Sequence, residues 1–483
     1  MTANKRAVSR KTAPAISNER PRGVTSHMRT KALQIMSVWA AAALVFGVST
    51  SASCRRETRA PRVYVIGLDG ATWDIIDPLI EQGKLPVFKA LKEDGAWARL
   101  RTFDPTLSAV VWTSVATGKT MIKHGIVDWA FVNKRDLQVP YSSSEKRVPS
   151  IWEMMDEHRL RSVVLNWFVT YPPDAVSGVV VSDSFPAAVL KALSGKGDPE
   201  ALTDTVHPPA EFRKLYGILS RMDAEGALKY PRLVQEMEIP DYVAEFKTRY
   251  SGDVKHVPIL SVWPSFLAYD RIQDTLVDHY LEENDYDLFL AYYRFPDVFF
   301  HFATLFLDKE YHDRIDAFVG APVEPSPEVL DEFNRKMAEV AWPILREKEA
   351  LLSRIVERAR KEKAYLLVVS DHGFRMSSKG YTHYGLPAGT PPPDGVLALI
   401  GPDIKPGLQI EASVYDVAPT ILYLKGLPVG ADLDGKPLLE PLTTVRRPVR
   451  TALYTRMRHR PAKENPDLDK KKLEELRSLG YIK

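Results

Sequence analysis

Cysteine is almost absent from this sequence of 483 residues, which contains only Cys54. A single cysteine excludes an internal disulfide framework. A strong charge of one sign is also lacking. Residues 1–53 hold eight Lys and Arg and one Glu, a net of +7; because the whole chain carries +3, the rest carries −4. Such a mildly acidic body gives no electrostatic reason to expect nucleic-acid binding.

Long apolar runs are rare as well, and the clearest one lies near the N-terminus. Ala32 to Val48 is uncharged and largely apolar, follows the basic segment 28–31, and precedes small residues that end at Cys54. This order is typical of a secretory signal, and Ser51-Ala52-Ser53-Cys54 resembles a bacterial lipobox. A retained membrane anchor stays an alternative, because about 17 apolar residues reach the lower limit for spanning a bilayer. Both alternatives predict an exported, membrane-tethered protein that faces the cell envelope or periplasm.

The chain is too long for one ordinary core, so we expect a large domain with insertions. The predicted parts are a polar leader or misread start at 1–27, the signal at 28–53, one large domain at 61–440 with a cap insertion at 185–261, and a C-terminal extension with a short helix at 441–483.

Short apolar runs alternate with helical patterns along the large domain. The predicted strands are Val63–Leu68, Ala96–Arg101, Arg161–Trp167, Val176–Ser182, Asp287–Tyr293, Ala364–Ser370 and Gly395–Ile400. The predicted helices are Thr72–Gln82, Val87–Asp94, Val110–Thr117, Ile151–Glu157, Pro208–Ser220, Tyr230–Met237, Ala268–Glu283, Pro325–Lys361, Tyr415–Leu424 and Leu473–Leu479. This alternation predicts an α/β fold with a mostly parallel central sheet flanked by helices.

Polar side chains follow several of these runs. Asp69 ends the first strand, and Ser108 stands in a turn just before a helix. In a parallel sheet such positions can share one ligand site, although the two residues can equally cap the helices that follow them.

Ligand-type residues recur at later strand ends. Asp297 and His301 are four residues apart, so on a helical turn they face the same way. Asp371 and His372 directly follow a fully apolar strand, and His383 lies in a loop ahead of the Gly395 strand. Each feature alone can be structural. Together they predict a metal site at one edge of the sheet, with imidazole and carboxylate ligands that suit zinc.

The ordered set of motifs resembles the alkaline phosphatase superfamily, and within it the type I phosphodiesterase / nucleotide pyrophosphatase family. The matching segments are Gly67-Leu68-Asp69-Gly70, Pro105-Thr106-Leu107-Ser108, Ala116-Thr117-Gly118, Lys123-His124-Gly125-Ile126, Pro296-Asp297 with His301, Ser370-Asp371-His372-Gly373, the segment 401–407, Tyr415-Asp416-Val417-Ala418-Pro419-Thr420-Ile421-Leu422, Gly426-Leu427-Pro428 and Asp434-Gly435.

The resemblance implies a hydrolase with two zinc ions and an alkaline phosphatase-like fold. It assigns Asp297, His301 and a later histidine to one ion, and Asp69, Asp371, His372 and the nucleophile Ser108 to the other. It also implies a covalent phospho-serine that water then hydrolyses. The expected substrate is a phosphoester, most simply a phosphodiester of a nucleotide, lipid headgroup or glycan.

Two positions depart from the family pattern. Relatives often carry the last metal histidine in a Gly-Thr-His context, but here Pro391 follows Gly389-Thr390, so we assign His383 instead. Nucleotide pyrophosphatases also carry an Asn where this chain has Trp129, so nucleotide specificity is not inherited. Thr106 and Thr113 are alternative nucleophiles that do not align with the family position.

Two rival functions remain. One is a related reaction: phosphomonoester or sulfate ester cleavage, or phosphoryl transfer to a lipid or glycan. The common sulfatase motif C/S-x-P-x-R is absent, because Ala109-Val110-Val111-Trp112 follows Ser108. The other is a non-catalytic envelope lipoprotein, which would have no chemical need for the whole set of ligand residues.

Overall fold

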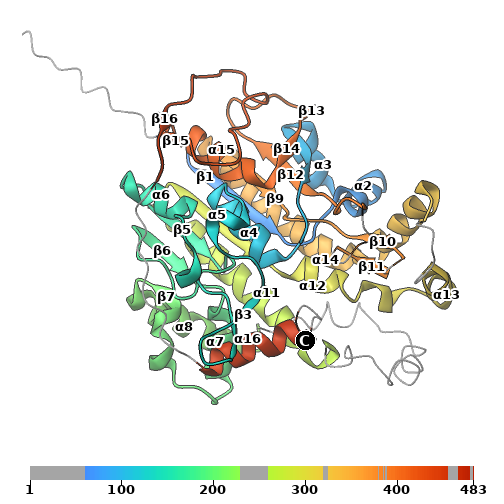
Figure 1. Ribbon diagram of the computed structural model, residues 1–483, viewed down its shortest axis with the longest axis horizontal. Helices are drawn as coiled ribbons and strands as arrows, with labels where there is room; N and C mark the ends of the chain where they lie inside the picture. The colour runs from blue at the N-terminus through green and yellow to red at the C-terminus, as the bar shows by residue number, and fades with distance from the viewer. Residues whose placement is uncertain are drawn as a thin grey trace, which may run out of the picture. The chain divides into compact units, whose positions relative to one another are not determined.

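A ten-stranded sheet forms the centre of the computed structural model, which describes residues 60–228, 259–318, 325–378, 380–383, 386, 389–454, 466–478 and 482 (Figure 1). Its strands are β1 (Val63–Leu68), β2 (Ala96–Arg101), β5 (Ser162–Leu165), β6 (Gly178–Val181), β7 (Val206–His207), β8 (Leu288–Tyr293), β9 (Tyr365–Val369), β12 (Gly395–Ile400), β13 (Leu408–Gln409) and β14 (Ala412–Ser413). They lie in the order β13-β2-β12-β9-β1-β8-β5-β6-β7, and β14 also pairs with β2.

Most of these strands run in one direction. β1 is parallel to β8 and β9, and β5 is parallel to β8 and β6. β12 is antiparallel to both β9 and β2, so β2 points the same way as β1. The predicted α/β fold with a mostly parallel sheet is confirmed, and the carboxyl ends of β1, β2, β8 and β9 meet at one edge.

Both faces of the sheet are covered, which explains the continuous apolar runs. In β1, Tyr64, Ile66 and Leu68 belong to one core cluster, whereas Val63 and Val65 belong to the other. Side chains alternate across a strand, so a strand with helices on both sides has no polar positions.

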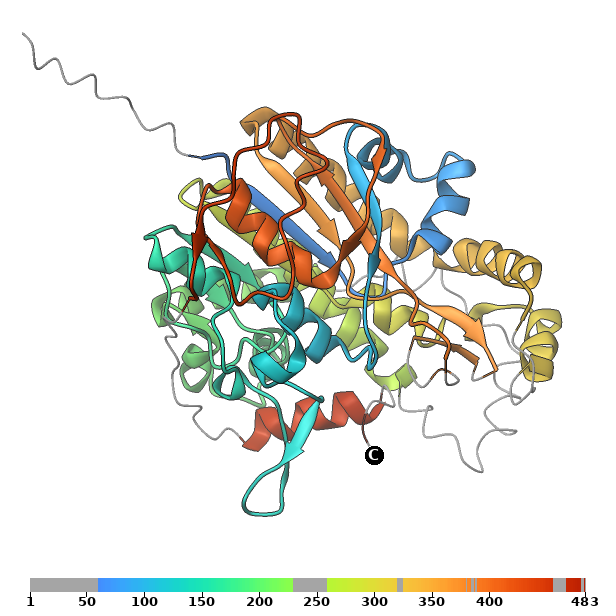
Figure 2. The same cartoon turned by 45° about the horizontal axis from the view of Figure 1, so that its top comes forward.

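The helices form two layers around the sheet (Figure 2). Side chains of the first core cluster come from α2 (Trp73–Glu81), α3 (Pro86–Glu93), α7 (Phe185–Leu193), α8 (Pro209–Ala224), α11 (Ile259–Glu282), α12 (Phe295–Phe300) and α14 (Pro327–Glu362). The second cluster uses α4 (Ser108–Thr117), α6 (Ile151–Glu157) and α15 (Val417–Leu424).

Smaller elements complete the described chain. They are α5 (Met121–His124), α13 (Lys309–Phe318), α16 (Pro466–Ser478), η1 (Ser143–Glu145), η2 (Pro199–Thr205), η3 (Ala303–Phe306), η4 (Val414–Asp416), and the paired strands β3 (Ala130–Val132) with β4 (Gln138–Pro140), β10 (Arg375–Ser377) with β11 (Gly380–Thr382), and β15 (Val429–Gly430) with β16 (Arg450–Thr451). The C-terminal helix α16 packs against β4, α7 and α11.

Several helices differ from their predicted bounds. The helix expected from Ala268 begins at Ile259, and the helix expected to end at Ser220 ends at Ala224. The helix expected from Val110 already begins at Ser108, and the tail helix expected from Leu473 begins at Pro466. The first turn of the tail helix is polar and opens with proline, which a helix start tolerates but apolar periodicity does not reveal. The predicted signal and its Cys54, and the predicted helix Tyr230–Met237, lie outside the described residues. In the described ranges, none of the helices combines the length and apolar character needed to cross a bilayer.

Candidate active site

The structure brings all seven predicted site residues to the carboxyl edge of the sheet. Asp69 directly follows β1, Ser108 is the first residue of α4, Asp297 lies in α12 with His301 just after it, Asp371 and His372 follow β9, and His383 follows β11. Their side chains are buried; even that of His301 is only 8% exposed.

Gly70 allows β1 and α12 to come together at this edge. Its φ is +73°, and an added Cβ would lie 3.0 Å from the Cα of Asp297. A residue with a side chain would therefore be strained and would push one acidic residue away from the other.

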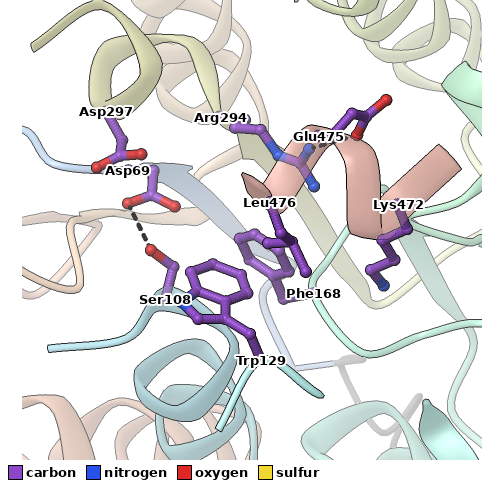
Figure 3. A pocket seen from close by; sticks show the side chains of 9 residues that line it. All are labelled: Asp69, Ser108, Trp129, Phe168, Arg294, Asp297, Lys472, Glu475 and Leu476. Atoms are coloured by element: carbon purple, nitrogen blue, oxygen red, sulfur yellow. Dashed lines mark hydrogen bonds and ion pairs between the residues drawn. The ribbon is translucent and has the colours of Figure 1, made fainter. Parts of the chain in front are cut away.

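The Ser108 hydroxyl points at the cluster of acids and histidines. Its Oγ donates to Asp69 Oδ1 at 3.4 Å (Figure 3). The same oxygen lies 3.4 Å from His372 Nε2. The hydroxyl is thus close to a carboxylate and an imidazole that could accept its proton.

The metal-ligand types fall into two overlapping groups. Donor atoms of Asp69, Asp371 and His372 lie within 4.8 Å of one another, and so do those of Asp297, His372 and His383. His301 completes the cluster, because its Nε2 lies 3.4 Å from Asp297 Oδ1 and 3.2 Å from His383 Nε2. The geometry places His372 between the two groups, whereas the family resemblance assigns it to one ion.

The electrostatics of the cluster favour a bound cation. Burial, followed by the charges of Asp371 and Asp297, raises the pKa of Asp69 well above its ordinary value. Burial likewise raises the pKa of Asp371. Burial, followed by the charges of His372 and His301, lowers the pKa of His383. Carboxyls that resist ionisation and a neutral imidazole are the donor set that a divalent cation would stabilise.

The histidine rings are oriented for ligation. His372 Nδ1 lies 3.1 Å from the carbonyl oxygen of Gly373, which can only accept, so in the neutral ring Nε2 carries the lone pair toward the acids. The rings of His372 and His383 stack with centroids 3.8 Å apart. Thr106 donates its hydroxyl to the backbone oxygen of His383 at 2.5 Å, so this predicted alternative nucleophile instead supports a histidine.

Two aromatic side chains that the sequence did not single out hold Asp69. Tyr292 donates to Asp69 Oδ2 at 2.5 Å, and Trp112 donates its indole N–H to the same oxygen at 3.1 Å. Gly67 makes room for that indole, because an added Cβ would lie 2.7 Å from the Trp112 ring. The sequence offers a signal for Tyr292, because this residue lies in the strand that leads to Asp297. It offers none for Trp112, which has the pattern of an ordinary core residue.

A small pocket opens beside Ser108, and part of its wall comes from the C-terminal helix. It is lined by Asp69, Ser108, Trp129, Phe168, Arg294, Asp297, Lys472, Glu475 and Leu476 (Figure 3). The Arg294 guanidinium lies 3.3 Å from Glu475 and 5.0 Å from the centroid of the Phe168 ring. Trp129, which takes the place of the expected Asn, therefore lines the same pocket as a guanidinium that could contact an anionic substrate.

Residues 63–385 match the model of the family described as type I phosphodiesterase / nucleotide pyrophosphatase. This match spans more than half of the chain and confirms the resemblance drawn from the motifs.

Solved structures with similar folds come from several enzymes. Murine ectonucleotide pyrophosphatase / phosphodiesterase 5, in an inactive form with AMP, is 13% identical with a TM-score of 0.41, over 76% of this chain and 96% of its own. Phosphonate monoester hydrolase from Silicibacter pomeroyi is 16% identical with a TM-score of 0.42, over 79% and 76%. A 2-O GAG sulfatase is 12% identical with a TM-score of 0.46, over 79% and 74%.

Proposed function

The chain belongs to the type I phosphodiesterase / nucleotide pyrophosphatase family, and we propose that it cleaves phosphodiesters with Ser108 as the nucleophile. Membership makes it a hydrolytic enzyme of the alkaline phosphatase superfamily, whose members depend on metal. The choice of phosphodiester, the nucleophile and the identity of the metal are our proposal.

The position of the Ser108 hydroxyl carries this proposal. Its Oγ stands at the start of α4, 3.4 Å from both Asp69 Oδ1 and His372 Nε2. In the first step, Oγ bonds to phosphorus as the bond to the leaving-group oxygen breaks, and that oxygen leaves with the proton that the serine gives up. In the second step, the oxygen of a water bonds to phosphorus and Oγ leaves with a proton. Two in-line displacements give net retention at phosphorus.

Two divalent cations, which we take to be zinc, fit the donor set of this site. The residues that would hold them are Asp69, Asp297, His301, Asp371, His372 and His383, with Ser108 beside them. When bound, a pair of such ions lowers the pKa of a hydroxyl and neutralises charge on phosphoryl oxygens.

The pocket walls favour an ester whose leaving group is partly apolar. Trp129, Phe168 and Leu476 supply apolar surface, and Arg294 supplies a guanidinium fork that suits phosphoryl oxygens. Arg294 would thus replace the donor that relatives place at Trp129.

We further propose that the protein is exported and held at the membrane through Cys54 or an uncleaved N-terminal anchor. Mass spectrometry of the protein from a bacterial host should find a lipid on an N-terminal Cys54, and Cys54→Ser should release the protein from the membrane fraction. An unmodified, intact N-terminus in the membrane fraction would support the anchor instead.

The function is tested with the purified full chain, loaded with zinc, on bis-p-nitrophenyl phosphate and p-nitrophenyl phosphate. We expect diester turnover that falls by at least about 10³-fold in Ser108→Ala, because losing a nucleophile removes most of the catalysis. The control is Ser194→Ala, which changes an exposed serine and should leave turnover unchanged.

Other outcomes of the same assay would favour one of the rival functions. Turnover of the monoester alone would identify a phosphatase. Bound zinc without turnover of either ester would favour a transferase or an enzyme of narrow specificity. Neither zinc nor turnover would favour the non-catalytic lipoprotein.

A further inference from the structure

Two small cavities meet at the ion pair between Arg294 and Glu475. One is the Ser108 pocket, with a volume of about 10 Å³. The other has a volume of about 40 Å³, and part of its wall comes from helix α11, including Tyr269 and Gln273. Among the described residues, only Arg294 and Glu475 line both cavities. Their ion pair is therefore part of the wall between them.

The Ser108 pocket is too small for the proposed substrate while this wall is in place. A volume of about 10 Å³ is about enough for one water molecule, and a phosphodiester with its organic groups is far larger. Asp69 and Asp297 belong to the packed edge of the sheet, whereas Glu475 and Leu476 come from α16, the last helix of the described chain (Figure 2). The side of the pocket formed by α16 is thus the one that can give way to a substrate.

Glu475 pairs with the cation that the proposed reaction uses. Its Oε2 lies 3.3 Å from Arg294 Nη1 (Figure 3). Its other carboxylate oxygen, Oε1, accepts from the Tyr269 hydroxyl at 2.5 Å. The side chains of Arg294 and Glu475 are only 19% and 13% exposed, so solvent screens their attraction less than it would on an open surface.

The Glu475 carboxylate resembles the group that Arg294 is proposed to bind. A carboxylate and the phosphoryl group of a diester each carry one negative charge shared between two oxygens, and a guanidinium binds either of them through the same N–H groups. Arg294 stands between β8 and the first residue of α12, and its guanidinium lies 5.0 Å from the centroid of the Phe168 ring. Because the arginine is held in this way, the carboxylate is the partner that can leave.

A second cation lies beside Glu475 on its own helix. Lys471 precedes Glu475 by four residues in α16, and side chains at this spacing are neighbours on a helix surface. The charges of Lys471 and Glu475 interact, and Lys471 lines neither cavity. A carboxylate that leaves Arg294 can therefore stay close to a positive charge, which costs less than leaving it buried and unpaired.

We propose that Glu475 is an intramolecular competitor of the substrate, whose phosphoryl group has to displace this carboxylate from Arg294. The inference rests on the proposed phosphodiesterase function. Protein in which Glu475 holds Arg294 does not bind the diester there, so the apparent dissociation constant rises as the share of that form grows. Withdrawal of Glu475 also removes part of the wall between the two cavities and so makes room for the ester.

The proposal is tested by calorimetric titration of the zinc-loaded full chain carrying Ser108→Ala, with bis-p-nitrophenyl phosphate as the probe. Glu475→Gln keeps the shape of the side chain and removes its charge, so we expect the dissociation constant to fall about tenfold or more. The matched control is Glu474→Gln, because it makes the same change of charge at a residue of α16 that is 60% exposed. It should leave the dissociation constant unchanged.

Two further variants separate the competition from a general effect of charge. Tyr269→Phe keeps every charge and removes the hydroxyl that holds Glu475 Oε1, so the dissociation constant should fall about two- to tenfold. In protein that also carries Arg294→Gln, Glu475→Gln should give no tighter binding, because the competition needs both partners.

Equal dissociation constants in Glu475→Gln and Glu474→Gln would overturn the proposal. Tighter binding by Glu475→Gln that persists in Arg294→Gln would overturn it as well, since it would show a general effect of charge. If Glu475→Gln does not fold, an unchanged dissociation constant in Tyr269→Phe decides against the proposal. The competitor and the reaction fail separately, because Ser108-dependent turnover tests the reaction and the ratio of dissociation constants tests the competitor. A diester that none of the variants binds would overturn both.

Discussion

Asp69 shows how single side chains set the geometry of this site. Its Oδ2 accepts from both Tyr292 and Trp112, which leaves Oδ1 facing Ser108 and His372. Removing one of these two hydrogen-bond donors should leave the carboxylate present but less firmly oriented. Partners of this kind around metal ligands typically change metal affinity by about 10–100-fold.

We therefore predict that Tyr292→Phe weakens zinc binding about tenfold or more and lowers kcat/KM, as measured with a competing chelator and with the diester assay. The control is Tyr293→Phe, since the hydroxyl of Tyr293 donates to Asp274 at 2.9 Å instead. Equal zinc affinity in both variants would show that the Tyr292 hydroxyl does not position Asp69.

Arg294 allows a second test at this scale. Its guanidinium lines the Ser108 pocket, and the proposed role is to hold a phosphoryl oxygen through two N–H groups. Arg294→Lys keeps the charge but loses the fork, so we expect kcat/KM for the diester to fall about 10–100-fold, the loss of about 1.4–2.7 kcal/mol of transition-state stabilisation. Arg354→Lys, at an exposed position on α14, should have no effect. A normal kcat/KM in Arg294→Lys would mean that charge alone is needed there.

At the scale of elements, helix α16 closes one side of the pocket. Leu476 lines the pocket, while Lys472 pairs with Asp183 at 2.6 Å and Tyr269 donates to Glu475 at 2.5 Å. These contacts fix the helix against distant parts of the chain, so its apolar side chains should limit the size of the leaving group.

We predict that Leu476→Ala shifts selectivity toward bulky diesters by about tenfold or more in kcat/KM relative to methyl p-nitrophenyl phosphate, since a methylene in an apolar pocket changes discrimination by about 1–3 kcal/mol. Leu473→Ala removes a buried leucine from the same helix that does not line the pocket. It should reduce stability and leave the selectivity ratio unchanged. A ratio that shifts equally in both variants would show that general loosening of α16, and not the pocket wall, sets selectivity.

For the whole molecule, the features that could be predicted are those determined by residues close together in the sequence. A run such as Val63–Leu68 is apolar at every position, so it identifies a buried parallel strand, and the residue after it must then lie at the carboxyl edge. The clustering of Asp69 with Asp371 follows from that topology, whereas their roles as ligands stay predictions. The place of α16 could not be predicted, because it depends on pairs such as Lys472 with Asp183, nearly 300 residues apart.

The stability of the whole unit should depend on metal in a way that changes with pH. Burial, together with neighbouring carboxylates, raises the pKa of Asp69, and burial raises that of Asp371. In the metal-free protein the folded state therefore holds these protons more tightly than the unfolded state, where the carboxyl pKa is about 3.9. The stability that they contribute is fully present below that value and is lost as the pH rises through the raised folded values.

A bound divalent cation replaces these protons, so the zinc-loaded protein should not lose this stability as the pH rises. We predict that the difference in unfolding free energy between the zinc-loaded and the chelator-treated protein widens from pH 5 to pH 8. It should reach about 2.7 kcal/mol for each ion bound when free zinc is 100 times the dissociation constant of its site. Urea titrations at both pH values measure it. A difference that stays constant would mean that the acids are not neutralised by metal, because protons and metal compete for the same oxygens only if these carboxylates are the ligands.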